Sequence, residues 1–407
     1  MASENESKSG TSTQDFSELC RTGPGTLGGR YLRQFWHPVL RSADLPVACA
    51  LPIKILDEEF TIYRGESGTP HVVGSRCPHR GTQLSVGWVE KELIRCRYHG
   101  WQFDETGQCT EIPANSPEFA SRMKIAGYPT KERVGLIFAY FGEGEPPEFP
   151  FPDFEGEGII ETRVQELGCN FFQSYENDWD LYHAAWTHRT GAIHMPIDVS
   201  KLSFEEVDYG VIMRSVRENG MRSTTVLMLP TTVRLPVPTH NALAYRRAGP
   251  AWRDTYLTHT PVDDENHLVF VTQQVRVSGA EAVEYRKHYE AYLEERRQMP
   301  VKAIGEEIVA GRRFFKDVLN HPNLVTLEDY IAQVGQGRMA DRSKDNLSRT
   351  DKGVLLLRQI WTRELNALKE GRPTKGWVPM MQRPDREIVE AVFRNPGTGA
   401  TKPLATA

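Results

Sequence analysis

Two short segments of the chain each combine a cysteine with a histidine. The first reads Cys77-Pro-His79 and the second Cys96-Arg-Tyr-His99, and each lies in a Gly- or Pro-containing loop after a β-like run. Two thiolates and two imidazoles suit a tetrahedral zinc ion or a two-iron, two-sulfide cluster. Zinc sites usually group like ligands together, whereas here each loop carries one of each. The mixed pairs therefore favour the cluster, with zinc and a chance pairing as the alternatives.

A second group of possible ligands lies in residues 176–188, which read ENDWDLYHAAWTH. Asp180 and His183 are three residues apart, about 60° on a helix, so they share a face. His183 and His188 are five residues apart, about 140° on a regular helix. Both can bind one metal ion only if a π-bulge or a helix end lies between them. Two buried, hydrogen-bonded histidines are the alternative that this segment alone leaves open.

The sequence pattern CPHRG…CRYHGW resembles the Rieske iron–sulfur motif, including the Gly-Trp that follows the last ligand. The resemblance implies a [2Fe-2S] cluster held by Cys77, His79, Cys96 and His99. Imidazoles in place of two thiolates raise the reduction potential of such a cluster. It can therefore accept electrons from a ferredoxin-type donor and pass them on.

The pattern E-x3-D-x2-H-x4-H is similar to the mononuclear iron motif of the Rieske non-haem iron oxygenases. On that resemblance His183 and His188 are two ligands of an Fe(II) facial triad, whose open face takes O2 and substrate. The family carries the third ligand near the C-terminal end, in a pattern like TLEDYIAQVGQG, which implies Asp329 with Glu328 as its neighbouring competitor. The resemblance makes Asp180 a bridge that hydrogen-bonds a histidine of each centre, usually across a subunit boundary.

The opening GPGTLGGRYLRQFWHPV resembles the α-only branch that includes phthalate and phenoxybenzoate dioxygenases and aromatic-acid O-demethylases. This resemblance implies a homotrimeric terminal oxygenase that receives NAD(P)H-derived electrons from a separate ferredoxin or reductase. The electrons would cross by the contact of His99 with Asp180. The implied substrate is an aromatic acid, oxidised by ring hydroxylation or oxidative O-demethylation, and Arg246 or Arg247 is a candidate for binding its carboxylate. The alternative is a Rieske electron carrier or a zinc-stabilised binding protein without oxygen chemistry.

The elements that must position these residues divide the chain in two. Short β-rich runs with Gly, Pro and Asp turns predict an all-β Rieske domain at residues 26–145, after a mobile tail at 1–25. A segment rich in Gly, Pro and Glu predicts a linker at 146–158. A catalytic domain at 159–395 and a tail at 396–407 follow. In the catalytic domain we expect a helix at 170–188, strands at 226–237, 241–248, 253–262 and 266–275, and helices at 280–298, 326–336 and 351–370. The fold class is therefore α+β, with antiparallel sheet and helices in the second domain.

The composition argues against several other classes of protein. Lys plus Arg is 49 and Asp plus Glu is 54, a formal net charge of −5, so nothing points to nucleic acid or an anionic membrane. Mean hydropathy is −0.49, and no apolar run approaches the roughly 18 residues of a membrane span. The N-terminus lacks an apolar signal segment, so we expect a cytoplasmic protein. The other cysteines, at 20, 49, 109 and 169, have no partnered spacing and are expected to be ordinary thiols.

Overall fold

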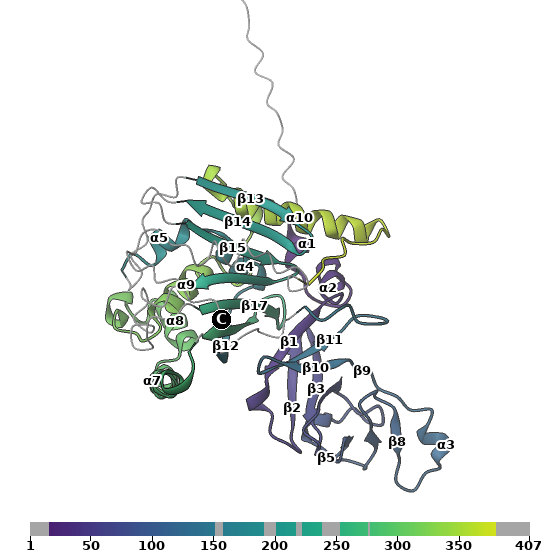
Figure 1. The fold of residues 1–407 in the computed structure, drawn as a ribbon. Helices are drawn as coiled ribbons and strands as arrows, with labels where there is room; N and C mark the ends of the chain where they lie inside the picture. Colours follow the sequence, from purple (N-terminus) through teal and green to yellow (C-terminus); the bar gives the residue numbers. More distant parts are fainter. Residues whose placement is uncertain are drawn as a thin grey trace, which may run out of the picture.

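The computed structural model describes residues 16–150, 158–190, 201–216, 222–237, 253–275 and 277–379. Figure 1 shows an N-terminal part made of small sheets and a larger C-terminal part in which helices pack on one broad sheet. This arrangement confirms the expected α+β class, with the all-β domain first. Within the described ranges, no helix is long and apolar enough to cross a membrane.

Residues 16–150 form three sheets with the strand orders β1-β11-β10, β2-β3-β4-β9 and β5-β6-β7-β8. Every pair of neighbouring strands is antiparallel. The run LIFAY of β11 is buried along its whole length, as a strand packed on both faces requires. The strands are Trp36–Arg41 (β1), Ala50–Ile55 (β2), Glu58–Arg64 (β3), Pro70–Gly74 (β4), Trp88–Glu90 (β5), Leu93–Arg95 (β6), Gln102–Phe103 (β7), Cys109–Glu111 (β8), Gly127–Tyr128 (β9), Thr130–Arg133 (β10) and Leu136–Tyr140 (β11).

The turn between β2 and β3 joins the two parts of the molecule. Leu56 and Asp57 both have positive φ, at 52° and 62°, which is the backbone that a two-residue type I′ hairpin turn needs. Their N–H groups donate to the carbonyls of Pro261 and Val262, both at 2.9 Å. These carbonyls lie where β17 (Arg253–Pro261) ends, so the N-terminal sheets are hydrogen-bonded to the C-terminal sheet.

The C-terminal part is built on a seven-stranded antiparallel sheet of order β12-β18-β17-β16-β15-β14-β13. The strands from β13 to β18 follow one another by hairpin pairing, and β12 closes the row by pairing with β18. The remaining strands are Ile159–Leu167 (β12), Lys201–Val207 (β13), Gly210–Val216 (β14), Arg222–Met228 (β15), Thr232–Val237 (β16) and His267–Val275 (β18).

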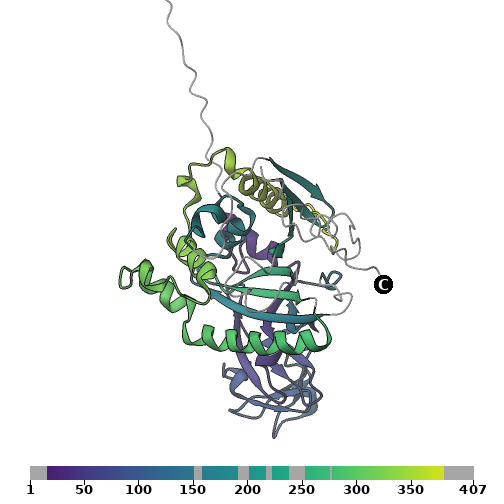
Figure 2. The same cartoon turned by 60° about the vertical axis from the view of Figure 1, so that its left-hand side comes forward.

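Helices from both ends of the chain cover one side of this sheet. One apolar cluster includes Tyr31 of α2, Phe171 and Tyr175 of α4, and Trp361 of α10. The N-terminal helices therefore share a core with the catalytic part (Figures 1 and 2). The helices are Ser17–Cys20 (α1), Leu27–Leu32 (α2), Pro117–Ala120 (α3), Phe171–Trp179 (α4), His183–Thr187 (α5), Gly279–Gln298 (α7), Val301–Val309 (α8), Leu324–Val334 (α9) and Lys352–Lys369 (α10).

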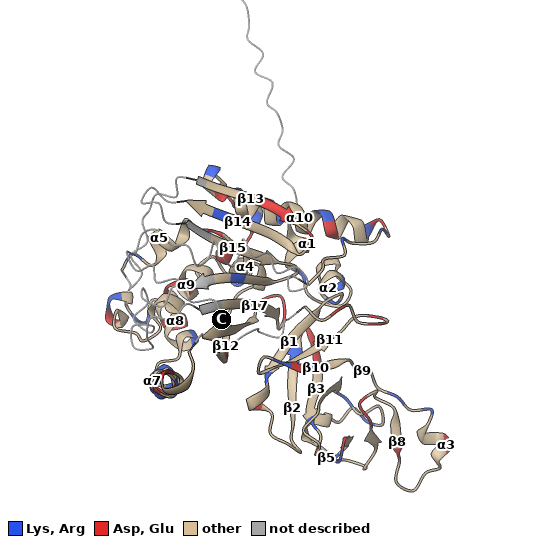
Figure 3. Ribbon diagram, viewed as in Figure 1, with Lys and Arg blue, Asp and Glu red and all other residues tan. Residues whose placement is uncertain are grey.

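Most expected elements of the second domain are present, with several differences. The helix expected at 170–188 is two helices, α4 and α5, and the strand expected at 226–237 is the end of β15, a turn and β16. The helix α8 and the strands β12, β13 and β14 were not expected from the sequence. The helices expected at 280–298, 326–336 and 351–370 correspond to α7, α9 and α10, and Figure 3 shows basic and acidic residues interspersed along α7 and α10. The strand expected at 241–248 lies outside the described residues.

Candidate metal centres

The two Cys/His loops have nearly the same backbone. In the first loop the N–H of Gly81 donates to the carbonyl of Cys77 at 2.9 Å, and in the second the N–H of Gly100 donates to the carbonyl of Cys96 at 3.0 Å. Gly81 has φ +75° and Gly100 has φ +74°, a left-handed backbone that glycine adopts without a steric penalty. Each loop is thus a tight turn that starts at its cysteine and ends at a glycine.

The four side chains of these loops separate into a buried pair and an exposed pair. Cys77 and Cys96 are 2% and 1% exposed and belong to one apolar cluster, whereas His79 and His99 are exposed. The two imidazole rings lie with their centroids 4.3 Å apart. Burial raises the pKa of the Cys77 thiol, and the neighbouring Cys96 adds to that rise. A bound cation is what would hold such buried thiols as thiolates.

This separation discriminates between the two metal sites that the sequence left open. One tetrahedral zinc ion would bring all four ligand atoms within about 4 Å of one another. Among the described residues, the group of three or more possible ligands that meets within 4.8 Å lies elsewhere, at residues 183, 188 and 329. A cysteine pair apart from a histidine pair is the donor set of a [2Fe-2S] cluster with two cysteines on one iron and two histidines on the other.

The second site brings together His183, His188 and Asp329, whose ligand atoms lie within 4.8 Å of one another. Asp329 Oδ1 lies 3.6 Å from Nε2 of His183 and 3.4 Å from Nε2 of His188. The helix α5 begins at His183 and ends before His188, which has φ −97° and ψ 13°. A helix end, one of the two distortions that the spacing demanded, therefore lets both rings face one point.

Asp180 lies between α4 and α5 and explains why the helix breaks there. It has an extended backbone, with φ −93° and ψ 105°. Its Oδ1 accepts a hydrogen bond from the N–H of Tyr182 at 2.8 Å, a local turn that competes with helix. The expectation that Asp180 and His183 share a helix face is wrong for this reason. His183 instead contacts the Asp180 backbone carbonyl through Nδ1, which leaves Nε2 directed at Asp329.

The two adjacent carboxylates of α9, Glu328 and Asp329, face different nitrogens of the His188 ring. Glu328 is 2% exposed, and its Oε2 accepts a hydrogen bond from Nδ1 of His188 at 2.9 Å. Its Oε1 accepts from Thr190 Oγ1 at 2.8 Å. Asp329 faces the Nε2 side of the same ring. Glu328 thus binds the Nδ1 side of the His188 ring, away from Asp329, which is the usual role of a carboxylate next to a metal-binding imidazole.

The charges of this group act on one another. Burial raises the pKa of Asp329, while the two histidines oppose that rise. Burial alone would lower the pKa of His188, but the hydrogen bond to Glu328 and the charge of Asp329 raise it overall. A dense, partly buried group of interacting candidate ligands is typical of a metal or catalytic site.

Asn177 is a member of this site that the sequence reasoning missed. Its Nδ2 donates to Asp329 Oδ1 at 3.3 Å and lies 3.3 Å from Nε2 of His183. It stands directly after the Glu176 of the motif, in the last turn of α4 before the break. An amide at that turn was the signal available in the sequence.

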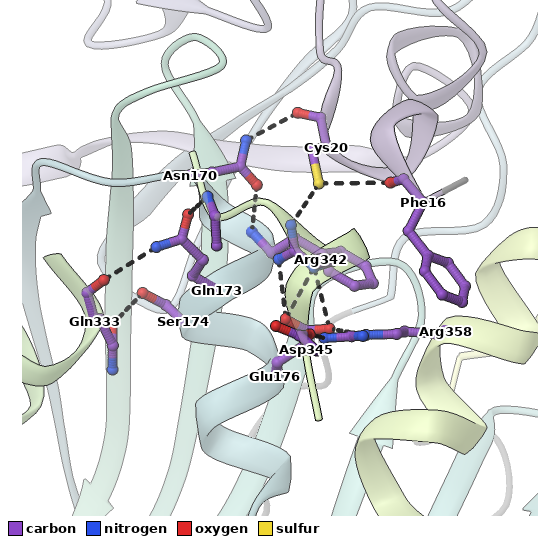
Figure 4. A network of polar contacts seen from close by, with 12 residues as sticks. Phe16, Cys20, Asn170, Gln173, Ser174, Glu176, Gln333, Arg342, Asp345 and Arg358 are labelled. Atoms are coloured by element: carbon purple, nitrogen blue, oxygen red, sulfur yellow. Dashed lines mark hydrogen bonds and ion pairs between the residues drawn. The ribbon is translucent and has the colours of Figure 1, made fainter. Parts of the chain in front are cut away.

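Glu176 itself belongs to a buried network with two arginines (Figure 4). Its carboxylate accepts from Nε of Arg342 at 3.1 Å and from Nε of Arg358 at 2.5 Å, and Arg358 also reaches Asp345 at 2.7 Å. Arg342 contacts the thiol of Cys20 at 2.7 Å, and burial raises the pKa of that thiol to about 11. The buried network holds α4 against α1, α10 and the segment after α9.

A second set of contacts ties α4 directly to α9. Gln173 Nε2 donates to the carbonyls of Gln333 and Gly337, both at 3.0 Å, and Ser174 donates to the side chain of Gln333. These bonds fix α4, and the histidines that follow it, relative to the carboxylates on α9. Arg246 and Arg247, the candidates for binding a substrate carboxylate, lie outside the described residues.

The donor sets, the fold and the comparisons with known proteins all indicate the same class of protein. Residues 35–129 match the model of the Rieske [2Fe-2S] domain. The Rieske domain and the homologous oxygenase subunits support a Rieske non-haem iron oxygenase, an enzyme with a [2Fe-2S] cluster and a mononuclear iron.

Its relatives belong to the branch of phthalate and phenoxybenzoate dioxygenases and aromatic-acid O-demethylases. The chain is 27% identical to the 5,5'-dehydrodivanillate O-demethylase oxygenase subunit of Sphingobium sp. (strain NBRC 103272 / SYK-6), over 97% of this chain and 86% of that protein. It is 29% identical to the phenoxybenzoate dioxygenase subunit alpha of Ectopseudomonas oleovorans, over 88% of this chain and 87% of that protein. The structure of Pseudomonas putida CBB5 NdmA has the same fold, with TM-score 0.61 and 20% identity over 84% of this chain and 92% of that one.

Proposed function

We propose that the chain is the terminal oxygenase of a multicomponent system that uses O2 and NAD(P)H-derived electrons to oxidise an aromatic acid. The observation that carries the proposal is the convergence of His183, His188 and Asp329 in a chain that also holds two Cys/His loops. The two relatives described above are named for dehydrodivanillate and phenoxybenzoate, both aromatic carboxylates. One is an O-demethylase and the other a dioxygenase, so ring hydroxylation and oxidative O-demethylation are both open.

In this proposal the two metal centres use the side chains that the motifs indicate. Cys77 and Cys96 would hold one iron of the cluster, and His79 and His99 would hold the other. His183, His188 and Asp329 would hold Fe(II). Three protein ligands leave positions open for O2. When bound, the cluster supplies single electrons and the mononuclear iron supplies oxygen activation.

Other side chains then orient the ligands and keep the site apart from water. Glu328 keeps a hydrogen on Nδ1 of His188, so that Nε2 offers its lone pair to the metal. Asn177 donates to the Asp329 oxygen that faces both histidines. His188 and Glu328 are almost fully buried, with side chains 5% and 2% exposed. This burial limits the access of bulk water to the ligand set from the α9 side.

We also propose that the enzyme is a homotrimer in which electrons enter each iron site from a neighbouring copy by way of Asp180. Within one chain, the sheet β5–β8, which lies beside the two Cys/His loops, is at the opposite end of the molecule from α5 and α9 (Figure 1). His79 and His99 are exposed and available to a second copy. Asp180→Asn should keep both metals but slow electron transfer, and light scattering should give three times the chain mass. Normal transfer in that variant, or a monomer that turns over at full rate, contradicts the proposal.

The experiment that tests the function is substrate-stimulated oxygen uptake by the iron-replete protein. NADH and a surrogate reductase supply electrons, and a panel of methoxylated and unsubstituted aromatic acids is screened. Formaldehyde release would establish O-demethylation, and a cis-diol or catechol product would establish ring hydroxylation. No stimulation by any acid, with the mononuclear iron present, would remove aromatic acids as the substrate class. An electron carrier would contain about two irons per chain, whereas the oxygenase needs about three.

A further inference from the structure

The indole ring of Trp101 lies flat against the imidazole of His79, one of the proposed cluster ligands. The two ring centroids are 4.9 Å apart, and the ring planes are inclined by only 2°. Trp101 is 7% exposed, whereas His79 is exposed. A buried aromatic ring therefore covers part of one face of an imidazole that is otherwise open to solvent.

Several contacts hold the indole in place. The carbonyl of Trp101 accepts a hydrogen bond from the N–H of Cys96 at 2.8 Å. The ring of Phe119 meets the indole edge-on, with centroids 6.2 Å apart and planes inclined by 89°. Trp101 also belongs to the apolar cluster that contains Cys77 and Cys96. The indole is thus a fixed part of the core against which the imidazole of His79 rests.

The second imidazole of the pair has a different neighbour. The ring of Tyr98 lies beside His99, with centroids 3.9 Å apart and planes inclined by 41°. Tyr98 is 55% exposed, and the guanidinium of Arg80 lies 5.4 Å from the centroid of its ring. His99 is therefore flanked by an exposed ring, while His79 is stacked on a buried one.

The stack restricts the orientation of the His79 imidazole. The torsion that turns an imidazole about its bond to Cβ has a broad energy profile, so an exposed histidine ring turns easily. A parallel contact with a fixed indole is lost when the imidazole rotates out of that plane. Trp101 therefore holds the His79 ring in one plane, and this plane sets how its nitrogen would approach an iron.

The same contact affects the energy of adding an electron to a bound cluster. Two Fe(III), two sulfides, two thiolates and two neutral imidazoles sum to zero charge, and one electron that reduces one Fe(III) to Fe(II) makes the charge minus one. Solvent around a cluster is one of the factors that set its potential, because water stabilises the charged state. The indole of Trp101 excludes water from one face of His79. Its π face is also negative, so both effects disfavour the added electron.

We propose that Trp101 is a positioning residue for the cluster, which fixes the plane of the His79 imidazole and keeps the reduction potential lower than water in its place would. This inference rests on the proposed role of His79 as a cluster ligand. A lower potential makes the reduced cluster a stronger electron donor toward the mononuclear iron site.

The test compares Trp101→Leu with Trp101→Phe in the holoenzyme, by spectroelectrochemical titration of the cluster. Trp101→Leu should raise the equilibrium constant for reduction about threefold to tenfold, which is about 30–60 mV at 59 mV per tenfold for one electron. Trp101→Phe keeps a flat ring and should stay near the wild-type potential. Phe103→Leu is the control for a loosened core, because Phe103 is 0% exposed in the same apolar cluster. It should lower the melting temperature and leave the potential unchanged.

A spectroscopic measurement reports the orientation of the histidine directly. Electron paramagnetic resonance of the reduced cluster, in protein labelled with 15N-histidine, gives the nitrogen couplings of the two imidazoles. One of the two couplings should broaden in Trp101→Leu and recover in Trp101→Phe. Trp101→Met, which is apolar but has no ring, is a second variant in case Trp101→Leu does not fold.

The wild-type potential and couplings in a ring-less variant that contains the cluster would overturn the proposal. Loss of acid-labile sulfide from both ring-less variants would also overturn it, since a positioning ring orients a ligand that can bind without it. Neither measurement needs a substrate. Absence of sulfide from the wild-type protein would instead reject the proposed cluster, and failure to take up O2 with any aromatic acid would reject only the substrate class.

Discussion

The Glu328 carboxylate accepts a hydrogen bond from Nδ1 of His188 at 2.9 Å, with the two side chains 2% and 5% exposed. This contact fixes the tautomer of the ring, because a hydrogen on Nδ1 leaves the lone pair on Nε2. Asp329, the next residue of α9, lies on that Nε2 side. The orientation of one ring thus distinguishes the supporting carboxylate from the candidate ligand.

Glu328→Gln should weaken binding of the mononuclear iron by roughly 10–100-fold, because a neutral amide orients His188 but no longer makes it a stronger ligand. Equilibrium dialysis against a graded chelator measures the affinity, and the visible spectrum of the cluster should not change. Glu307→Gln, in an exposed pair with Arg313, is the control. Wild-type iron affinity in Glu328→Gln would contradict the supporting role.

Asp329→Ala should remove the mononuclear iron and spare the cluster, because the ligand sets come from different domains. Iron content should fall by about one atom per chain while sulfide stays at about two. Substrate-stimulated oxygen uptake should be lost. Full iron content in the Asp329→Ala protein would show that another residue supplies the third ligand.

Cys77→Ser should abolish the cluster, since a serine is a poor ligand for iron in a sulfide cluster. Acid-labile sulfide should fall to background and zinc should stay absent. Cys109→Ser is a matched control, because Cys109 is 3% exposed and lies in the same apolar cluster. Stoichiometric zinc in the wild-type protein would instead support the structural-zinc alternative.

Glu176→Gln should lower the free energy of unfolding by about 3–5 kcal/mol, because it leaves the buried guanidinium groups of Arg342 and Arg358 short of a counter-charge. The Glu176 side chain is 11% exposed. Glu205→Gln breaks a pair in which the glutamate is 56% exposed and should cost less than about 1 kcal/mol. Urea unfolding of both variants measures the difference. Equal, small losses would mean that the network adds little stability.

His37 should make the fold less stable as the pH falls. Burial lowers its pKa to about 4, from an ordinary 6.5. Between these values the unfolded chain binds a proton that the folded chain does not, so this contribution is complete above about pH 6.5 and is lost toward pH 4. Going from pH 7 to 5, His37→Gln should lose about 2 kcal/mol less stability than wild type. Parallel pH dependences in the two proteins would contradict the assignment.

Much of the fold and of the metal chemistry was predictable from local sequence. The Cys/His loops, the histidine pair and the long helices at 280–298 and 351–370 are encoded by residues close together in the chain, where spacing and apolar patterns are informative. The break between α4 and α5 was harder to predict. It depends on the Asp180 side chain capturing the N–H of Tyr182, a local bond that competes with an otherwise helical pattern.

The sequence by itself indicated the candidate ligands, their order along the chain and the part of the chain that carries each set. The tertiary structure decided which neighbouring carboxylate meets which edge of His188, because adjacent residues point about 100° apart on a helix and packing alone sets the rotation of α9. It also decided the pairing of Asp178 with His259, which are 81 residues apart. Contacts between a helix and a distant strand follow from how apolar faces pack, and no spacing in the chain records them.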